Sequence, residues 1–504
     1  MKKANIYLIN PHLIFAKNDL FTTGVVYLPV GLAYLASKLK QESIPFDLID
    51  CFGEKPNQFR SVNNFVFRGL ENSEIISKIE DNNPLIFAIY AINLAAHNSL
   101  EELVILLRKN YPSSKIIVFE NSQAVTAYSL KKIQKEILSI GADFIATGDV
   151  EEGPFQLIKE LYIGNEPMKR EIPGVGYQYL GEHLYNNQLI KVDALDANPF
   201  PLWEIFPLEN YWSLKYSHGP FETKKYLPLF TSRGCPYPCN FCVIPSTNDK
   251  KWRSRSAENV VQEMVYFYEK LGVTEFHIED VDPTINENRT KEFCEKLLAT
   301  GISFKWKICA GTKVETIRKE NTLELMAKAG CNYISISPET GSEELLKKIN
   351  KPFNLNHCIK LVQKMKEVGI YSQACFVLGF PGETKADREK TFSLVKQLTK
   401  IGLDEIAQFI VTPVPGSAIY DQFSGYNSFS DLNFSPLWRK DYDELNKFRV
   451  KLYRSFLIWK LIYNPLSLIK QPFYFLTRRF KTKMEMTPYR VLRTYYLSYR
   501  KVHS

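Results

Sequence analysis

The stretch Gly234-Cys-Pro-Tyr-Pro-Cys-Asn-Phe-Cys242 places Cys235, Cys239 and Cys242 at a C-x3-C-x2-C spacing, directly after the apolar run at residues 227–230. Three thiols in one loop indicate a metal site. A closed zinc site needs a fourth ligand, normally from a second paired knuckle, and no C-x2-C or H-x3-H pair follows in the chain. Soft thiolates suit an iron–sulfur cluster, in which three protein ligands leave one iron open to a small molecule.

The cysteine count argues against a disulfide framework. Nine cysteines is an odd number, the chain is long, and we see no secretory leader with an apolar core and a small-residue cleavage site. We therefore expect reduced thiols and a cytoplasmic protein. Outside the loop, the cysteines are isolated in mostly apolar surroundings, and we expect them to be small buried hydrophobes. They are Cys51, Cys294, Cys309, Cys331, Cys358 and Cys375.

Length and charge set the outline of the molecule. A chain of 504 residues is expected to divide into two or three domains, each with its own core. The formal charge of +9 is not spread evenly: from Leu445 to the end there are 14 Lys and Arg against one acid, Glu485, so this segment carries +13 and the rest −4. No apolar run reaches the roughly 18 residues that a membrane span needs.

The first 160 residues alternate short apolar runs with helical patterns, which predicts a doubly wound, parallel α/β sheet. Ligands of such sheets bind outside the carboxyl ends of the strands, at the topological switch point. The residues that follow the predicted strands are therefore the candidates for ligand contact. They are Pro11, Asn93, Glu120, Asn121 and Gly148, the last of which opens an acidic turn.

Residues 161–225 are irregular, and we interpret them as a linker that packs on both neighbours. From residue 226 to about 430 the strand-then-helix alternation returns in six units, which predicts a partial (β/α)6 barrel with its site at the carboxyl ends of the strands. The predicted strands lie at residues 227–231, 275–279, 304–309, 333–337, 372–378 and 405–411.

The cysteine loop, with the aromatic Phe241 just before its last cysteine, resembles that of the radical S-adenosylmethionine (radical SAM) superfamily, and the later polar loops follow in the superfamily's order. The resemblance implies a [4Fe–4S] cluster on Cys235, Cys239 and Cys242, which cleaves S-adenosylmethionine to a 5'-deoxyadenosyl radical. Its cofactor contacts would be Glu279 and Asp280 at the methionine amino group, Glu339 and Ser342 at the ribose or carboxylate, and Gly379 at the adenine. Taken singly, each of these positions also suits a turn or a helix cap.

The N-terminal domain resembles the cobalamin-binding domain that precedes many radical SAM barrels. The matching pieces are Ile9-Asn-Pro11, Pro29-Val-Gly-Leu-Ala-Tyr-Leu35, Asp50 and Gly141-Ala-Asp-Phe-Ile-Ala-Thr-Gly148. Two features depart from that pattern: Glu120-Asn121 stands where paired glycines are usual, and there is no Asp-x-His-x-x-Gly loop to supply a histidine to cobalt. The domain therefore either binds cobalamin without a histidine beneath the metal, or covers the barrel without a cofactor.

The resemblance implies an enzyme, and with cobalamin it implies methyl transfer to an unactivated carbon. Two alternatives stay open. One is a radical oxidation or cyclisation of a hydrophobic substrate, as in the anaerobic Mg-protoporphyrin monomethyl ester cyclase branch, and the other is a non-catalytic iron–sulfur or cobalamin sensor. The implied partners are a small-molecule substrate, hydrophobic in the cyclase alternative, and an external electron donor of the flavodoxin or ferredoxin type.

The basic segment from residue 431 to 504 is predicted to be helical. Phe448, Leu452, Phe456, Trp459 and Tyr463 recur at helical spacing, with basic residues on the other side. Such a helix either docks on the barrel with a solvated basic face or lies in a membrane interface as a peripheral contact. We expect no nucleic-acid partner, because the basic residues belong to no recognised module.

Overall fold

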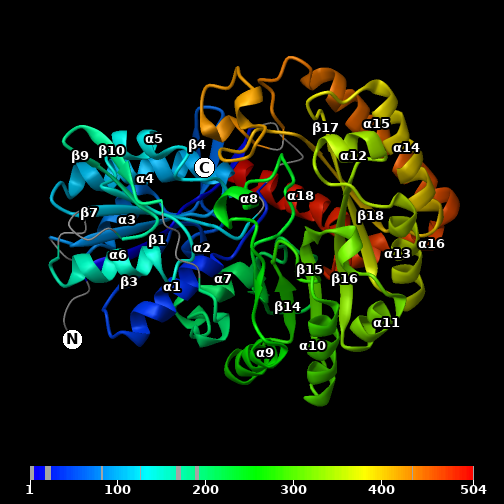
Figure 1. Cartoon of the computed structure of the whole chain (residues 1–504), viewed down its shortest axis with the longest axis horizontal. Coiled ribbons are helices and arrows are strands. Elements are labelled where there is room, and N and C mark those ends of the chain that lie inside the picture. Colours follow the sequence, from blue (N-terminus) through cyan, green and yellow to red (C-terminus); the bar gives the residue numbers. More distant parts are fainter. Residues whose placement is uncertain are drawn as a thin grey trace.

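The computed structural model describes residues 5–17, 24–80, 83–124, 127–165, 172–187, 192–433 and 435–502, the last eight without side chains. Two large sheets lie side by side, the N-terminal sheet on the left of Figure 1 and the barrel on the right, with the C-terminal helices packed against the barrel. This is the α/β architecture predicted from the sequence.

The N-terminal sheet has seven strands in the order β10-β9-β8-β7-β6-β1-β3. The order runs from β1 to β3 in one direction and from β1 through β6, β7 and β8 in the other, which places the switch point between β1 and β6. The parallel strands are β1 (Ile6–Asn10), β3 (Asp47–Asp50), β6 (Ile86–Ala91), β7 (Lys115–Glu120) and β8 (Phe144–Ala146). The main helices of this domain are α1 (Val30–Gln41), α4 (His97–Asn110), α5 (Gln134–Ser139) and α6 (Gly153–Tyr162).

The sheet extends beyond the boundary predicted at residue 160, and the linker prediction is wrong for part of the segment that follows. Strands β9 (Val175–Tyr179) and β10 (Glu182–Tyr185) form an antiparallel hairpin beside β8, with Ile145 opposite Gly176. The hairpin covers what would be an unpaired edge of the parallel sheet. A two-strand addition of this kind has no α/β periodicity, so the sequence pattern did not reveal it.

The second sheet is the predicted partial barrel. Six parallel strands run in the order β11-β14-β15-β16-β17-β18, and the end strands β11 and β18 do not pair, so the barrel is open. The strands are β11 (Tyr226–Leu229), β14 (Glu275–Ile278), β15 (Lys305–Thr312), β16 (Cys331–Glu339), β17 (Tyr371–Leu378) and β18 (Glu405–Ile410). The helices between them are α9 (Ala257–Leu271), α10 (Glu287–Ala299), α11 (Glu320–Lys328), α12 (Glu343–Lys348), α13 (Leu355–Val368) and α14 (Lys385–Lys400).

A small antiparallel sheet, which the sequence pattern did not predict, is inserted in the first domain. It pairs β5 (Phe65–Arg68) with β2 (Leu13–Ala16) on one side and β4 (Phe59–Val62) on the other. Because β2 comes only three residues after β1 ends, the insert is held at the carboxyl edge of the large sheet.

Buried ion pairs join the two large domains. Arg233 donates to both carboxylate oxygens of Glu151 at 2.5 and 2.8 Å, and Arg253 donates to Asp149 at 2.5 Å. All four side chains are almost fully buried. Arg233 and Arg253 lie on the two-residue strands β12 (Ser232–Arg233) and β13 (Arg253–Ser254), which flank the cysteine loop. Two carboxylates of the acidic turn after β8, those of Asp149 and Glu151, therefore contact the barrel.

The C-terminal segment forms α15 (Tyr442–Tyr463), α16 (Pro465–Ile469), α17 (Gln471–Thr477) and α18 (Lys483–Val502). Helix α15 packs on α14 and β18 and buries Leu445, Leu452 and Phe456. In the part of the chain that the structure describes, no helix is both long enough and apolar enough to cross a membrane.

Candidate functional site

A large cavity of about 860 Å³ lies between the carboxyl edges of the two sheets. The first domain contributes Asn10 and Pro11 at the end of β1, Asn93 and Leu94 after β6, and the small sheet. The barrel contributes the cysteine loop. The cavity thus lies at the switch point of one sheet and the active-site end of the other, the two positions where these folds bind ligands.

The cysteine loop is held in place on three sides. Gly234 begins it in a left-handed conformation with φ +75°, where a Cβ would overlap the carbonyl oxygen of Lys251. The Gly234 N–H donates to Gln123 Oε1 of the first domain at 3.0 Å. Near the other end, the Phe241 ring packs on Phe380 with centroids 5.2 Å apart. Phe241 also lines the cavity.

Cys235, Cys239 and Cys242 all line the cavity and are half-buried. Burial raises the pKa of Cys235 and of Cys242 to about 12, and it raises the pKa of Cys239 above its usual range. Such thiols are protonated until a metal displaces the protons. Three soft donors on one loop that borders a cavity fit an iron–sulfur cluster with one iron left for a small molecule.

A buried cation accompanies the thiols. Lys351, in the loop after α12, donates to Glu339 Oε1 at 2.6 Å, and both side chains are buried. Its positive charge opposes the rise in pKa at each of the three cysteines. Lys351 was missed by sequence reasoning, because a lone lysine in a polar loop carries no motif and reaches the site only through the fold.

Two further polar groups lie beside the loop. The Lys313 Nζ is 4.1 Å from the centre of the Tyr237 ring, and burial lowers the pKa of this lysine to about 8. Asp282 accepts from Thr312 Oγ1 at 2.6 Å through Oδ1, while its buried Oδ2 has no hydrogen-bond partner among the described residues. Asp282 lines the cavity, and a ligand donor that reached this buried oxygen would supply the partner that it lacks.

Among the positions expected to contact S-adenosylmethionine, only Glu339 faces the cavity. It ends β16 at a register shift with a left-handed φ of +62°. Asp280 instead accepts from the backbone N–H and the hydroxyl of Thr231, both at 2.7 Å, and so ties the end of β14 to the end of β11. Glu279 accepts from His218 Nδ1 at 2.5 Å and lies with His277 and Cys309, whose ligand atoms are within 4.8 Å of its own.

Ser342 and Gly379 do not line the cavity. The Ser342 hydroxyl donates to Asp387 Oδ1 at 2.5 Å and caps α12. Gly379 has φ +80°, and a Cβ there would meet Leu445 and Arg439 of the C-terminal segment. The absence of a side chain at Gly379 thus makes room for the protein's own chain, and not for a ligand in this cavity.

The first-domain candidates divide in the same way. Pro11 and Asn93 line the cavity, whereas Glu120, Asn121 and Gly148 do not. The buried Glu120 carboxyl accepts from the Leu130 N–H at 2.8 Å, and burial raises its pKa to about 8. Asn121 donates to the Ile92 carbonyl at 2.8 Å. These residues end or follow β7 and β8, which are the first and second strands beyond β6 and not at the switch point itself.

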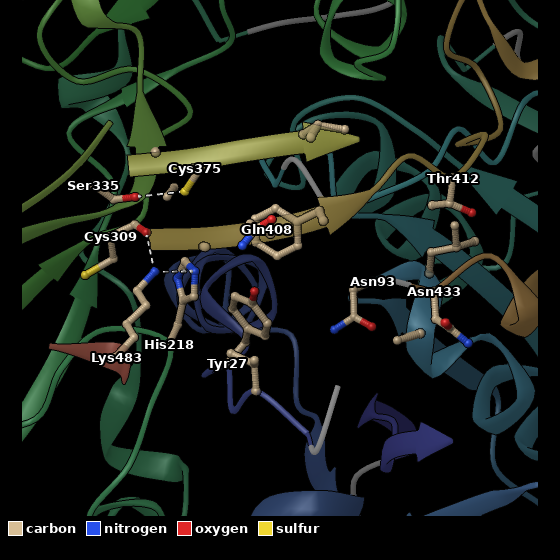
Figure 2. Close-up of a pocket in the computed structure, with 18 of the residues that line it drawn as sticks. Tyr27, Asn93, His218, Cys309, Ser335, Cys375, Gln408, Thr412, Asn433 and Lys483 are labelled. Carbon is tan, nitrogen blue, oxygen red and sulfur yellow. Dashed lines mark hydrogen bonds between the residues drawn. The ribbon is translucent and has the colours of Figure 1, made fainter. Parts of the chain in front are cut away.

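The floor of the cavity is built by segments without a recognised motif (Figure 2). The Lys483 Nζ, at the start of α18, donates to the Cys309 carbonyl at 2.8 Å and lies 3.3 Å from His218 Nε2. The rings of His218 and Tyr27 are 4.7 Å apart. Figure 2 shows the side chains of Ser335 and Cys375 close to this group, with Asn93 and Thr412 toward the other end. Helices α15 and α18 of the C-terminal segment supply lining residues.

Residues 229–395, which contain the cysteine loop and most of the barrel, match the family described as the Radical SAM superfamily. This part of the chain is therefore a radical SAM domain. The whole chain is 26% identical over 441 residues to an uncharacterised methyltransferase of Pyrococcus horikoshii, covering 87% of this chain and 86% of the relative. It is 23% identical to the cytidylyl-2-hydroxyethylphosphonate methyltransferase of Streptomyces wedmorensis, covering 82% and 80%.

Solved structures agree on the fold. The radical SAM methyltransferase TsrM from Kitasatospora setae, solved with cobalamin and a [4Fe–4S] cluster, superposes with a TM-score of 0.63 at 15% identity, covering 84% of this chain and 76% of that one. The cobalamin-dependent radical SAM enzyme OxsB superposes with a TM-score of 0.61 at 18% identity, covering 89% and 56%. The arrangement of an N-terminal sheet ahead of an open barrel is therefore shared with both.

Proposed function

We propose that this radical SAM protein is a cobalamin-dependent methyltransferase that methylates an unactivated carbon of a hydrophobic small molecule. One observation carries the proposal: a single cavity is bordered by the three cysteines of the barrel and by Pro11 and Asn93 at the switch point of the N-terminal sheet. A cluster and a corrin bound at these two positions would face the same space. Two relatives that cover more than four-fifths of the chain are named methyltransferases.

The first domain suits a corrin that has no histidine ligand beneath the cobalt. His12 lines the cavity, but its Nδ1 lies 2.7 Å from Ser99 Oγ and its Nε2 lies 2.8 Å from the Leu70 carbonyl. Both ring nitrogens are therefore occupied, and burial lowers the pKa of this histidine to about 4. The side of the cavity formed by Pro11, Asn93 and Leu94 presents short side chains on which a flat macrocycle can lie.

The roles of the chain's own residues follow from their positions. When bound, the cluster supplies the electron that cleaves S-adenosylmethionine, and cobalamin supplies a carrier for the methyl group. Cys235, Cys239 and Cys242 hold the cluster, and Lys351 offsets the negative charge of the thiolates. The unpartnered Asp282 Oδ2 accepts a hydrogen bond from the ligand, for which the ammonium group of S-adenosylmethionine is suited. The electron comes from an external donor of the flavodoxin or ferredoxin type.

The lining favours a hydrophobic acceptor. The surface of the cavity is mainly apolar, although Gln373, Glu405, Gln408, Arg449 and Arg490 are also among its lining residues. The apolar lining residues include Val377, Ile406, Phe409, Ile410, Val411, Met484 and Met486. Apolar pockets with few polar groups bind ligands through surface burial and orient them through the polar groups.

The test is an anaerobic reconstitution with iron, sulfide and hydroxocobalamin. We expect about one corrin per chain to stay bound through gel filtration, and reduced protein to convert S-adenosylmethionine to both 5'-deoxyadenosine and S-adenosylhomocysteine. The second product reports methyl transfer to the corrin. Formation of 5'-deoxyadenosine without retained corrin would overturn the methyltransferase proposal and leave the oxidation or cyclisation that the name of the Rubrivivax gelatinosus cyclase relative describes.

A further inference from the structure

An uncovered apolar surface lies at the far end of α15 and continues through α16 and α17. We call it the apolar surface; its members are Leu457, Ile458, Leu461, Ile462, Leu466, Ile469, Phe473 and Leu476, all exposed. Ile462 is 63% exposed, Leu466 69% and Leu476 79%. Single exposed apolar residues are ordinary, but eight within 20 residues of chain mark a contact site.

The two short helices keep much of their apolar surface exposed: α17 contacts α18, with the Phe475 and Tyr489 ring centroids 6.1 Å apart, while Leu466, Ile469, Phe473 and Leu476 stay exposed. Helix α16 has five residues and α17 has seven, and neither has a buried residue. Helices this short are not stable in water on their own and depend on packing of an apolar face. Figure 1 shows α16 at the outer edge of the barrel, on the side away from the N-terminal sheet.

Charge identifies what covers the surface. Lys470, Arg478 and Arg479 are exposed at the ends of the two short helices, and no acidic residue occurs between Leu445 and Glu485. Other cations of this segment, such as Arg449, Lys460 and Arg490, are buried, so these exposed ones carry the charge beside the apolar surface. A second copy of the chain would bring the same cationic segment against itself, and like charges repel. Apolar side chains flanked by Lys and Arg are instead suited to lie at the boundary between anionic headgroups and acyl chains.

We propose that the apolar surface docks on a phospholipid membrane that contains anionic lipids. The apolar surface and the cavity meet on α15. Arg454 and Leu457 line the cavity, and they lie on the same helical stripe of α15 as Leu461. The wall of the cavity therefore runs into the apolar surface, and the docked protein holds this wall next to the bilayer. The benefit of holding the cavity wall next to the bilayer rests on the proposed function. The methyl acceptor would then be an amphiphile that enters the cavity from the bilayer.

The experiment uses full-length protein and sedimentation with vesicles, without S-adenosylmethionine or cobalamin, so that its outcome does not depend on methyl transfer. The probes are phosphatidylcholine vesicles with and without about 30 mol% phosphatidylglycerol. We expect binding to the anionic vesicles that weakens at least about tenfold in roughly 0.5 M salt. Binding to neutral vesicles should be much weaker, because the cations then have no counterpart.

Two matched variants locate the site. Ile462→Glu combined with Leu466→Glu puts charges into the apolar surface and should lower partitioning at least about tenfold. Ile105→Glu, on an exposed helical position of the first domain (53% exposed), should bind like the wild type. Both variants change exposed side chains, so equal iron content and circular dichroism check that the fold is intact.

Three outcomes would overturn the proposal. The first is that wild-type protein does not bind anionic vesicles, and the second is that the double variant binds them as well as wild type. The third is that wild-type protein self-associates in sedimentation equilibrium and the double variant does not. The last would assign the surface to a second copy. None of these outcomes affects the proposed function, which is read from corrin retention and the two adenosyl products.

Discussion

Replacing Lys351 with Met isolates the electrostatic role of the buried pair beside the cysteine loop. Lys351 and Glu339 are both at least nine-tenths buried, with Nζ and Oε1 2.6 Å apart. At an effective dielectric constant of about 20, charges at that separation attract by roughly 6 kcal/mol, most of which offsets the cost of removing them from water. Removing one partner leaves an uncompensated buried charge, so we expect the Lys351→Met protein to lose about 3–5 kcal/mol of unfolding free energy.

The loss has a characteristic pH dependence. Burial raises the pKa of Glu339 and Lys351 opposes that rise, so in the variant the pKa of this carboxyl in the folded protein lies further above that of the unfolded chain. Between the unfolded and folded pKa values the folded state binds more protons than the unfolded chain, and its stability falls as the pH increases. The deficit against the wild type should therefore be larger at pH 8 than at pH 5.5.

Urea unfolding of cluster-free protein measures these differences. Lys351→Met combined with Glu339→Gln should recover more than half of the loss, because no charge is left buried. Lys348→Met on the exposed face of α12 is the matched control and should cost little. A Lys351→Met deficit below about 1 kcal/mol, or a double variant no more stable than the single one, would refute the reasoning.

Three further predictions concern the first domain. Burial raises the pKa of Glu120 to about 8, so this carboxyl is protonated in the folded protein at neutral pH. In urea unfolding, the stability of the wild type should therefore fall relative to Glu120→Gln between about pH 4.5 and pH 8, and the difference should level off above pH 8. The absence of a trend over this range would show that the carboxyl is solvated. Arg233→Met leaves Glu151 buried without its partner, and calorimetry should register a loss of about 3–5 kcal/mol that Glu151→Gln partly restores. His12→Gln should leave the spectrum of bound corrin unchanged; a shifted spectrum would place the imidazole on the cobalt.

The sequence predicted those parts of the fold whose signal is local and repeated. All six barrel strands were found because each is an apolar run followed by a helical pattern, and the cysteine loop was found because its spacing is itself a chemical requirement. The hairpin of β9 and β10 was missed, since its strands are recognisable only beside the edge of β8 that they cover.

The sequence located the strand ends, but it did not predict which side chains at those ends face the cavity. Pro11, Asn93 and Glu339 face the cavity, whereas Ser342 caps a helix and Gly379 accommodates Arg439. A strand end suits a ligand or a structural contact equally well from sequence. Lys351, α15 and α18 line the cavity although they are distant from the cysteine loop along the chain, and no local sequence pattern predicts this.

The C-terminal segment confirms the docked-helix interpretation, and the membrane-interface interpretation stays a proposal. Leu452 and Phe456 are fully buried against the barrel, as a docked helix requires. The exposed side of the same helix is apolar toward its end, at Leu461 and Ile462, and not a uniformly solvated basic face. The aromatic spacing predicted the side of α15 that packs on the barrel. The exposed apolar side of the helix can be recognised only once the buried side is known.

The central claim is that Cys235, Cys239 and Cys242 hold a cluster whose open iron cleaves S-adenosylmethionine in the cavity between the two sheets. The most direct test compares wild-type protein with Cys239→Ala and with Cys51→Ala, a buried thiol away from the cavity, after anaerobic reconstitution and reduction. The account predicts about four irons per chain and 5'-deoxyadenosine from the wild type and from Cys51→Ala, and no 5'-deoxyadenosine from Cys239→Ala. A Cys239→Ala protein that retained the irons and produced 5'-deoxyadenosine at the wild-type rate would contradict it.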